Sequence, residues 1–214
     1  MPGRDAFFTI LRMHDRLLQR RKAQAPHTTY SKHDYSIQPN LFKDLVLTRP
    51  LQAFVSDITY LRVGRRFAYL FLVTDAFSKR IMGYHLSHTL EHQGAINALH
   101  MSIKDIRDPG GIIHHSDRGV QYCCHQFLDA LKTLSMRSSM TDANHCAQNA
   151  LAERMNGILK NEFYLDLPFL DFKAAHKAVA QAVLLYNEER THGSLKMNGK
   201  MSTPEVYHFA ALAA

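Results

Sequence analysis

The chain has 214 residues, of which 46% are hydrophobic and 10% are aromatic, so global disorder is excluded. No stretch approaches the roughly 18 uninterrupted apolar residues that a membrane span requires. Charged residues interrupt the N-terminal stretch, which a signal peptide would keep apolar. We therefore expect no membrane segment, and a core domain of about 150 residues with an appendage.

The formal net charge of +7 is unevenly placed along the chain. Residues 1–50 hold nine Lys and Arg against four Asp and contribute +5, whereas the remaining 164 residues contribute +2. A basic arm before a nearly neutral body indicates a polyanionic partner, with nucleic acid as the first choice. On charge alone, these basic residues could instead form a solvated, arginine-rich helix end that binds no partner.

The three cysteines do not predict a disulfide framework, because the count is odd and Cys123 and Cys124 are adjacent. A reducing compartment fits this cysteine usage. The pairs His114-His115 and Cys123-Cys124 lack the spacing of zinc ligands, and neighbours on a strand point to opposite faces. We therefore expect no zinc site.

Apolar spacing predicts the helices and strands of the chain. Residues 4–22 have helical spacing with a basic end, and residues 23–50 lack a period, which indicates a linker or extended arm. Three apolar strands on short connections follow and predict an antiparallel meander, after which strands and helices alternate. This order predicts an α/β mixed sheet with helices packed on it. The expected elements are strands 52–63, 67–75 and 80–87, helix 91–106, strand 112–116, helix 124–134, strand 136–140, and helices 147–163 and 171–188.

Two acidic residues stand where strand propensity disfavours them. Asp57 interrupts an apolar strand, and Asp117 closes the strand in IIHHSDRG as the chain turns. An acid inside a strand needs an exposed face or a partner for its charge. Ordinary turn chemistry is an alternative explanation for Asp117, and an exposed strand face is one for Asp57.

A third acid lies on the predicted helix 147–163. Steps of about 100° per residue place Asn149, Glu153, Asn156 and Lys160 on one face, opposite an apolar face. A solvated face of an amphipathic helix is the alternative interpretation of this stripe. Three carboxylates on two strands and one helix could hold a pair of Mg²⁺ ions, since Mg²⁺ prefers oxygen ligands.

Several motifs in order along the chain carry a family resemblance. They are FVSDITYL (54–61), YLFLVTDAFSKRIMGYHLS (69–87), IIHHSDRGVQY (112–122), NALAERMNGILKNEF (149–163), YNEERTHGSL (186–195) and STPEVY (202–207). Together they resemble the integrase core of bacterial insertion-sequence transposases, the DDE recombinases related to retroviral integrases. The resemblance points to large second-frame products of frameshifting elements. It includes 35 residues between Asp117 and Glu153, the spacing that names the family's motif.

The resemblance implies an RNase H-like fold, with a mixed five-stranded sheet flanked by helices and a short helical N-terminal arm. It also implies that Asp57, Asp117 and Glu153 form the catalytic triad and hold two Mg²⁺ ions, for which Mn²⁺ can substitute. Tyr122 matches a residue that lines the site, and Asp75 is interpreted as structural at a hairpin. The DNA-binding residues expected from the resemblance and the charges are Lys160, Arg154, Arg118, Gln121, Asn149, Arg20, Arg21 and Lys22.

The expected domains follow from the same resemblance. Residues 50–208 form the integrase core with a C-terminal helical segment, and residues 209–214 form a tail. Residues 1–49 resemble the final helix and linker of an upstream helix-turn-helix DNA-binding region, whose earlier helices are absent from the sequence. A truncated copy and a frame that is completed by frameshifting are both open interpretations.

The leading hypothesis for function is a Mg²⁺-dependent DNA transposase that hydrolyses a phosphodiester at the element's end and transfers the strand to target DNA. A catalytically inactive DNA-binding remnant and an RNase H-type nuclease are the alternatives. The expected partners are DNA at the element ends and at the target, a homo-oligomer on DNA, and a first-frame DNA-binding product of the same element. The expected location is the bacterial cytoplasm, in association with the nucleoid.

Overall fold

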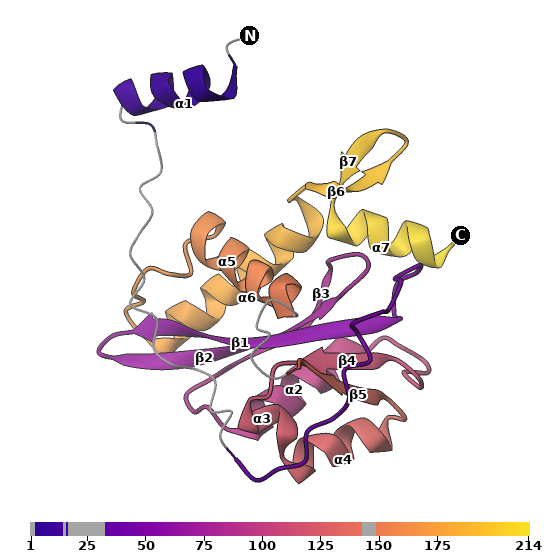
Figure 1. Cartoon of the computed structure of the whole chain (residues 1–214). Coiled ribbons are helices and arrows are strands. Elements are labelled where there is room, and N and C mark those ends of the chain that lie inside the picture. Colours follow the sequence, from indigo (N-terminus) through magenta and orange to yellow (C-terminus); the bar gives the residue numbers. More distant parts are fainter. Residues whose placement is uncertain (1–2, 15, 17–32, 143–148) are drawn as a thin grey trace.

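A five-stranded mixed sheet forms the centre of the molecule in the computed structural model, which describes residues 3–14, 16, 33–142 and 149–214 (Figure 1). The strand order is β3-β2-β1-β4-β5. β2 pairs antiparallel with both β1 and β3. β4 pairs parallel with β1 on one side and with β5 on the other. The predicted meander and mixed sheet are confirmed. The strands are β1 (Ala53–Val63), β2 (Arg66–Asp75), β3 (Ile81–Ser87), β4 (Ile113–Ser116) and β5 (Arg137–Met140).

Helices cover both faces of this sheet (Figure 1). On one face α5 and α6 pack against a cluster that includes Leu70, Leu72 and Leu159. On the other face α2, α3 and α4 enclose a second cluster around Phe71 and Val73. β2 contributes alternate residues to the two clusters, which explains why its sequence is almost continuously apolar. The helices are α2 (His92–Ile103), α3 (Val120–Cys123), α4 (His125–Thr133), α5 (Ala150–Glu162) and α6 (Phe172–Glu188).

The N-terminal helix is shorter than predicted. α1 (Arg4–Met13) ends where the N–H group of His14 bonds to the carbonyl oxygens of Ile10 and Arg12, so the expected helix 4–22 is wrong in its length. Residues 15 and 17–32 lie outside the described part of the chain. No helix within the described ranges is long and apolar enough to cross a membrane.

The C-terminal segment contains elements that apolar spacing did not predict. A two-stranded hairpin of β6 (His192–Met197) and β7 (Lys200–Ser202) leads into α7 (Pro204–Leu212). The side chain of Thr203 accepts a hydrogen bond from the Val206 N–H, and Pro204 occupies the first turn. The STPEVY motif is therefore a helix start, with a capping threonine and an N-terminal proline. α7 continues into the stretch expected as a tail.

Residues 33–50 form an extended arm without helix or strand, as predicted, but this arm packs on the core. Phe42 stacks on the His115 ring with a centroid distance of 4.8 Å. The Met140 N–H donates to the Pro39 carbonyl, and the Leu41 N–H donates to the Ser139 hydroxyl. The arm thus covers the outer edge of β5, which would otherwise offer unpaired backbone groups.

Candidate active site

Two of the expected catalytic acids lie on adjacent parallel strands. Asp57 lies inside β1, and Asp117 directly follows the last residue of β4. The register pairs Val55 of β1 with His115 of β4. Because each aspartate comes two residues after this pair, the two positions stand level on neighbouring strands.

The Asp57 carboxylate is half-buried and accepts two hydrogen bonds. Its Oδ1 accepts from the Ile58 N–H at 2.9 Å, and its Oδ2 accepts from Nδ2 of Asn156 at 2.8 Å. Burial raises the pKa of Asp57 to about 7, with a further increase from the Asp117 carboxylate and a smaller one from Glu153. The three expected acids therefore interact electrostatically around Asp57.

Asp117 also begins the turn into α3. Its Oδ1 accepts from the Gly119 N–H at 3.0 Å, so the turn interpretation of this residue holds alongside its position beside Asp57. A Cβ atom at Gly119 would lie 3.0 Å from Oδ1 of Asp117 and 3.1 Å from Oε1 of Gln121. The glycine therefore leaves room for both oxygens on one side of the turn.

α5 contributes Glu153 in its first turn, with an exposed side chain. The flanking asparagines are buried: Nδ2 of Asn149 donates to the Ser56 carbonyl at 3.1 Å, and Asn156 binds Asp57. The interpretation of this stripe as a solvated helix face is therefore wrong for both asparagines. The pattern signalled Asn156 only as a member of the stripe, and its bond to Asp57 was not predicted.

Lys160 lies at the far end of the same stripe. Its ammonium group is 4.1 Å from the centroid of the Tyr60 ring, close enough for a cation–π interaction. Burial lowers the pKa of Lys160, and the charges of Asp57 and Asp166 act in the opposite direction. Lys160 therefore lies within electrostatic reach of the carboxylates.

Three buried amide oxygens surround this region, and none has a hydrogen-bond partner among the described residues. They are Oε1 of Gln121, Oδ1 of Asn149 and Oδ1 of Asn156. The Gln121 side chain is anchored at its other end, where Nε2 donates to the Leu90 carbonyl at 2.9 Å. Buried oxygens without partners are costly unless they serve another ligand.

The donor chemistry fits a hard divalent cation, because the available groups are carboxylate and amide oxygens. Within the described ranges, however, no three His, Cys, Asp or Glu side chains are close enough to hold a metal ion as they stand. Like charges on the three acids repel one another, and a cation between them would offset that repulsion. The site therefore has the right oxygens, and its carboxylates must come closer together to share an ion.

The remaining expected site residues have different environments. Nε of Arg118 donates to the Thr141 carbonyl at 2.7 Å, and the Arg118 carbonyl bonds to the His33 ring of the arm. The Arg154 side chain is exposed, directly after Glu153. Tyr122 is packed in the core, with its ring centroid 5.4 Å from that of Phe127. Three expected DNA contacts lie outside the described residues, namely Arg20, Arg21 and Lys22.

Asp75 has the structural role expected of it. Its fully buried carboxylate accepts from the Leu51 N–H, the Ser78 N–H and the Ser78 hydroxyl, at 2.7–2.8 Å. All three donors belong to segments that meet at the β2–β3 turn. This carboxylate therefore stabilises the turn.

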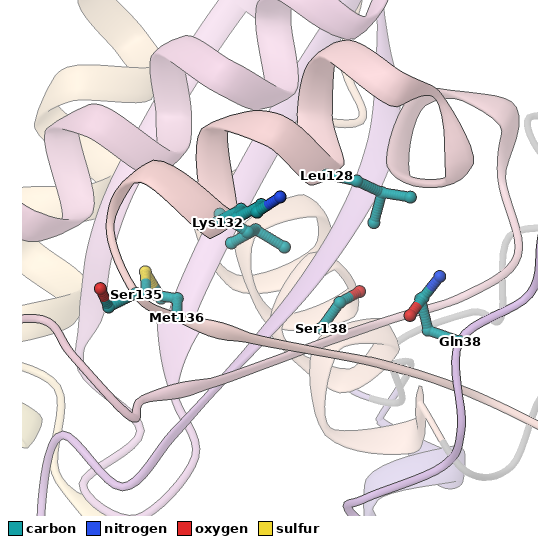
Figure 2. Close-up of a pocket in the computed structure, with 7 residues that line it drawn as sticks. Gln38, Leu128, Lys132, Ser135, Met136 and Ser138 are labelled. Atoms are coloured by element: carbon teal, nitrogen blue, oxygen red, sulfur yellow. The ribbon is translucent and has the colours of Figure 1, made fainter.

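A pocket of about 290 Å³ lies away from the carboxylates, between α4, β5 and the arm (Figure 2). Figure 2 shows Leu128 and Lys132 on α4, facing Gln38 and Ser138 across this hollow. The other lining residues are Leu131, Ser135 and Met136. None of the expected site residues lines it, so we place the candidate active site at Asp57, Asp117 and Glu153.

Solved structures with the same fold include an intasome chain and integrase catalytic cores. A chain of the simian T-cell lymphotropic virus intasome matches with a TM-score of 0.61 and 20% identity, over 86% of this chain and 63% of that chain. The catalytic core of HTLV-2 integrase matches with a TM-score of 0.57 and 21% identity, over 75% and 97% of the two chains. The fold is thus the RNase H-like fold of the integrase cores. Two family models described as integrase core domains match residues 48–146 and 134–199.

Sequence relatives identify the branch of this class. The insertion element IS600 uncharacterized 31 kDa protein of Shigella sonnei is 31% identical over 208 residues, which cover 96% of this chain and 76% of that protein. Transposase InsF for insertion sequence IS3A of Escherichia coli K12 is 34% identical over 135 residues, 63% of this chain. The chain spans about half the length of InsF, at 47%. The chain belongs to the insertion-sequence transposases with an integrase core domain.

Proposed function

We propose that this chain is the catalytic core of a DNA transposase that cuts a phosphodiester at the end of its element and joins the strand to target DNA. The observation that supports this most is the placement of Asp57 and Asp117 level on neighbouring strands, beside the helix that carries Glu153 and whose Asn156 bonds to Asp57, in a chain of the transposase family. In the first step water attacks phosphorus and the P–O3′ bond breaks, which leaves a 3′-OH. In the second step that hydroxyl attacks a phosphodiester of the target, whose own 3′-oxygen leaves.

Asp57, Asp117 and Glu153 are proposed to hold divalent cations, with Mg²⁺ as the physiological ion and Mn²⁺ as a substitute. The HTLV-2 integrase core was solved in complex with magnesium. When bound, a pair of such ions activates the attacking oxygen and stabilises the leaving oxygen. The oxygen donors described above fit this group, and Asn156 orients Asp57 through its hydrogen bond.

The chain's own residues hold the nucleic acid in this proposal. Lys160 and Arg154, both on α5 with Glu153, neutralise backbone phosphates, and Gln121 and Asn149 offer their unpartnered oxygens as acceptors to water bound beside the strand. Arg118 contributes charge from the turn after Asp117. No residue forms a covalent bond to DNA. The basic residues Arg20, Arg21 and Lys22 are proposed as further phosphate contacts.

We propose that the active form is a homo-oligomer assembled on the element ends, in the bacterial cytoplasm. The solved simian T-cell lymphotropic virus chain with this fold belongs to an intasome. A first-frame product of the same element is the proposed second protein partner. The proposed domain division is a basic region over 1–49 and the core over 50–208, and most of the stretch 209–214 expected as a tail continues α7 of the core.

The test is a strand-transfer assay with purified protein, Mg²⁺ and labelled DNA that carries the sequences flanking the coding frame. We expect products with the wild type and none after Glu153→Gln or with EDTA. The matched control is Glu162→Gln on the same helix, because the Glu162 carboxylate pairs with Arg190 at 2.6 Å on the exposed surface. Glu162→Gln is expected to keep full activity.

Two outcomes would contradict this function. Strand transfer that survives Glu153→Gln or EDTA would exclude the proposed metal-dependent mechanism. An RNA–DNA hybrid supplies the second comparison, because an RNase H-type nuclease would cleave it in preference to duplex DNA. The transposase proposal predicts activity on duplex DNA alone.

A further inference from the structure

The turn between β2 and β3 is held at four consecutive residues by the C-terminal segment, which we call the clamp (Tyr186, Asn187, Glu205 and His208). Figure 1 shows α6 and α7 reaching this end of the sheet. The Ser78 hydroxyl lies 2.9 Å from Nδ1 of His208, and the Tyr186 hydroxyl donates to the Lys79 carbonyl at 3.0 Å. Nε of Arg80 pairs with Oε2 of Glu205 at 2.5 Å. The Asn187 amide accepts from the Ile81 N–H at 2.9 Å and donates to the Ile81 carbonyl at 3.0 Å.

Lys79 has a conformation that few lysines adopt. Its φ angle of 65° lies in the left-handed region, where glycine is the ordinary residue. Such a conformation persists only where surrounding contacts enforce it, and it is often associated with function. Here the clamp fixes the Lys79 backbone, and the Asp75 carboxylate fixes Ser78 directly before it. A constrained lysine rather than a glycine therefore suggests a role for its side chain.

The clamp places Lys79 beside the first turns of α5. The Tyr186 hydroxyl that bonds to the Lys79 carbonyl also lies 3.3 Å from the sulfur of Met155, the residue after Arg154. Burial lowers the pKa of Lys79, the charge of the Asp75 carboxylate acts in the opposite direction, and the Arg154 charge lowers the pKa further. Lys79 and Arg154 are therefore neighbouring positive charges, and Arg154 directly follows the catalytic candidate Glu153.

The nearby acids are already engaged. Glu162 binds Arg190 through two contacts of 2.6 and 2.7 Å. His192 adds no charge at neutral pH, because burial and the surrounding cations lower its pKa to about 4. Arg154 makes no hydrogen bond or ion pair within the described part of the chain, and the Lys79 ammonium donates only to the Ala76 carbonyl there. The Asp75 carboxylate near Lys79 accepts three other hydrogen bonds, from Leu51 and Ser78. Both cations can therefore also bind an anion from outside.

We propose that Lys79 and Arg154 each neutralise a backbone phosphate of the DNA strand that leads to the carboxylates, and that the clamp presents Lys79 for this contact. The proposal rests on the proposed function, because it takes DNA as the polyanion. It adds Lys79, on the β2–β3 turn, to the binding surface. It also gives the C-terminal segment a part in substrate binding.

Salt-dependent DNA binding tests this site without any chemistry. The probe is a fluorescein-labelled duplex of arbitrary sequence, with anisotropy measured in EDTA over a series of salt concentrations. Each lost phosphate contact lowers the slope of log affinity against log salt by about 0.9. We expect Lys79→Met and Arg154→Gln each to lower the slope by that amount, with about a five- to tenfold lower affinity at low salt, and their effects to add.

Matched variants separate charge from folding. Lys79→Arg keeps the charge and is expected to keep the wild-type slope. Lys132→Met removes an exposed lysine of α4, on the other face of the sheet and beside the pocket of Figure 2, and is expected to change nothing. Circular dichroism melts of each variant establish that the protein tested is folded.

The proposal is overturned if folded Lys79→Met and Arg154→Gln keep the wild-type slope. It is also overturned if Lys132→Met lowers the slope as much as they do, since the effect would then reflect net charge alone. Failure of the proposed function would give a different result: the wild type would show no strand transfer, although Lys79→Met and Arg154→Gln would still lower the salt slope of DNA binding. Strand transfer with unchanged slopes would reject only the phosphate site.

Discussion

Two clusters of polar side chains, most of them buried, differ in how completely they are hydrogen-bonded. In the clamp, Asn187 uses both ends of its amide, and Glu205 and His208 each bind a residue of the β2–β3 turn. Around the carboxylates, Asn156 uses one end and leaves its oxygen without a partner, as do Asn149 and Gln121. The difference separates polar groups that stabilise the fold from polar groups that remain available for a ligand. Variants matched across the two clusters test this distinction.

The largest expected effect is on catalysis by the carboxylates. Asp117→Asn should lower the strand-transfer rate by about a thousandfold, or about 4 kcal/mol, because it removes a proposed ligand charge. Its stability should stay within about 1 kcal/mol of wild type, since Asn can still accept from the Gly119 N–H. The measurements are timed strand transfer and urea unfolding. The matched control is Asp171→Asn, which keeps an N-cap on α6 and should not alter the rate.

The two asparagines give the sharpest comparison of stability. Asn187→Ala should lower the free energy of unfolding by about 2–3 kcal/mol, because it leaves the backbone groups of Ile81 unpaired at the start of β3. Asn156→Ala should cost less than about 1 kcal/mol but lower strand transfer, because it releases Asp57. Urea unfolding of both variants checks this. An equal loss of stability in the two would remove the distinction between the clusters.

The pH dependence of stability follows from Asp57. Its pKa of about 7 in the folded chain is above the value of 3.8 in the unfolded chain, so the folded state holds the proton more tightly between these values. Folded stability is therefore favoured at low pH and falls as pH rises through this window. In EDTA, Asp57→Asn should be more stable than wild type by about 1–2 kcal/mol near pH 8, with the gap closing toward pH 4. Urea unfolding measures this difference in the free energy of unfolding between the two proteins. A difference that does not change with pH would contradict the raised pKa of Asp57.

The smallest expected effect concerns the ion pair beside the clamp. The Glu162 side chain is 48% exposed, so its pair with Arg190 is largely solvated. Glu162→Gln should cost less than about 1 kcal/mol of unfolding free energy, and added salt should narrow that difference. Unfolding at low and high ionic strength measures it. A salt-independent loss of several kcal/mol would mean that this pair belongs with the groups that stabilise the fold.

Apolar patterning was enough to predict the sheet. The runs of β1, β2 and β3 and their short connections determine the meander, and the apolar stripes of α5 and α6 mark the face that packs on it. The single-turn helix α3 and the β6–β7 hairpin were not predicted, because neither is long enough to show a hydrophobic period. The packing of Phe42 and its neighbours on the core was not predicted, because an extended arm has no hydrophobic period that would indicate a buried face.

The acids of the candidate site could be proposed from the sequence, whereas the groups that support them could not. Asp57, Asp117 and Glu153 followed from strand interruption, helix phase and a family motif. The bond between Asn156 and Asp57 depends on how α5 crosses β1, and the position of Lys79 depends on contacts from residues 186–208. Both are tertiary features, and local sequence does not specify them.

The central claim is that Asp57 and its neighbours form a site for a divalent cation. Its most direct test is the thermal unfolding of the wild type and Asp57→Asn near pH 8 as Mg²⁺ is added, because a ligand that binds only the folded state raises Tm. The account predicts a concentration-dependent rise in Tm for the wild type and none for Asp57→Asn. An equal rise in both proteins would place the cation elsewhere and contradict the claim.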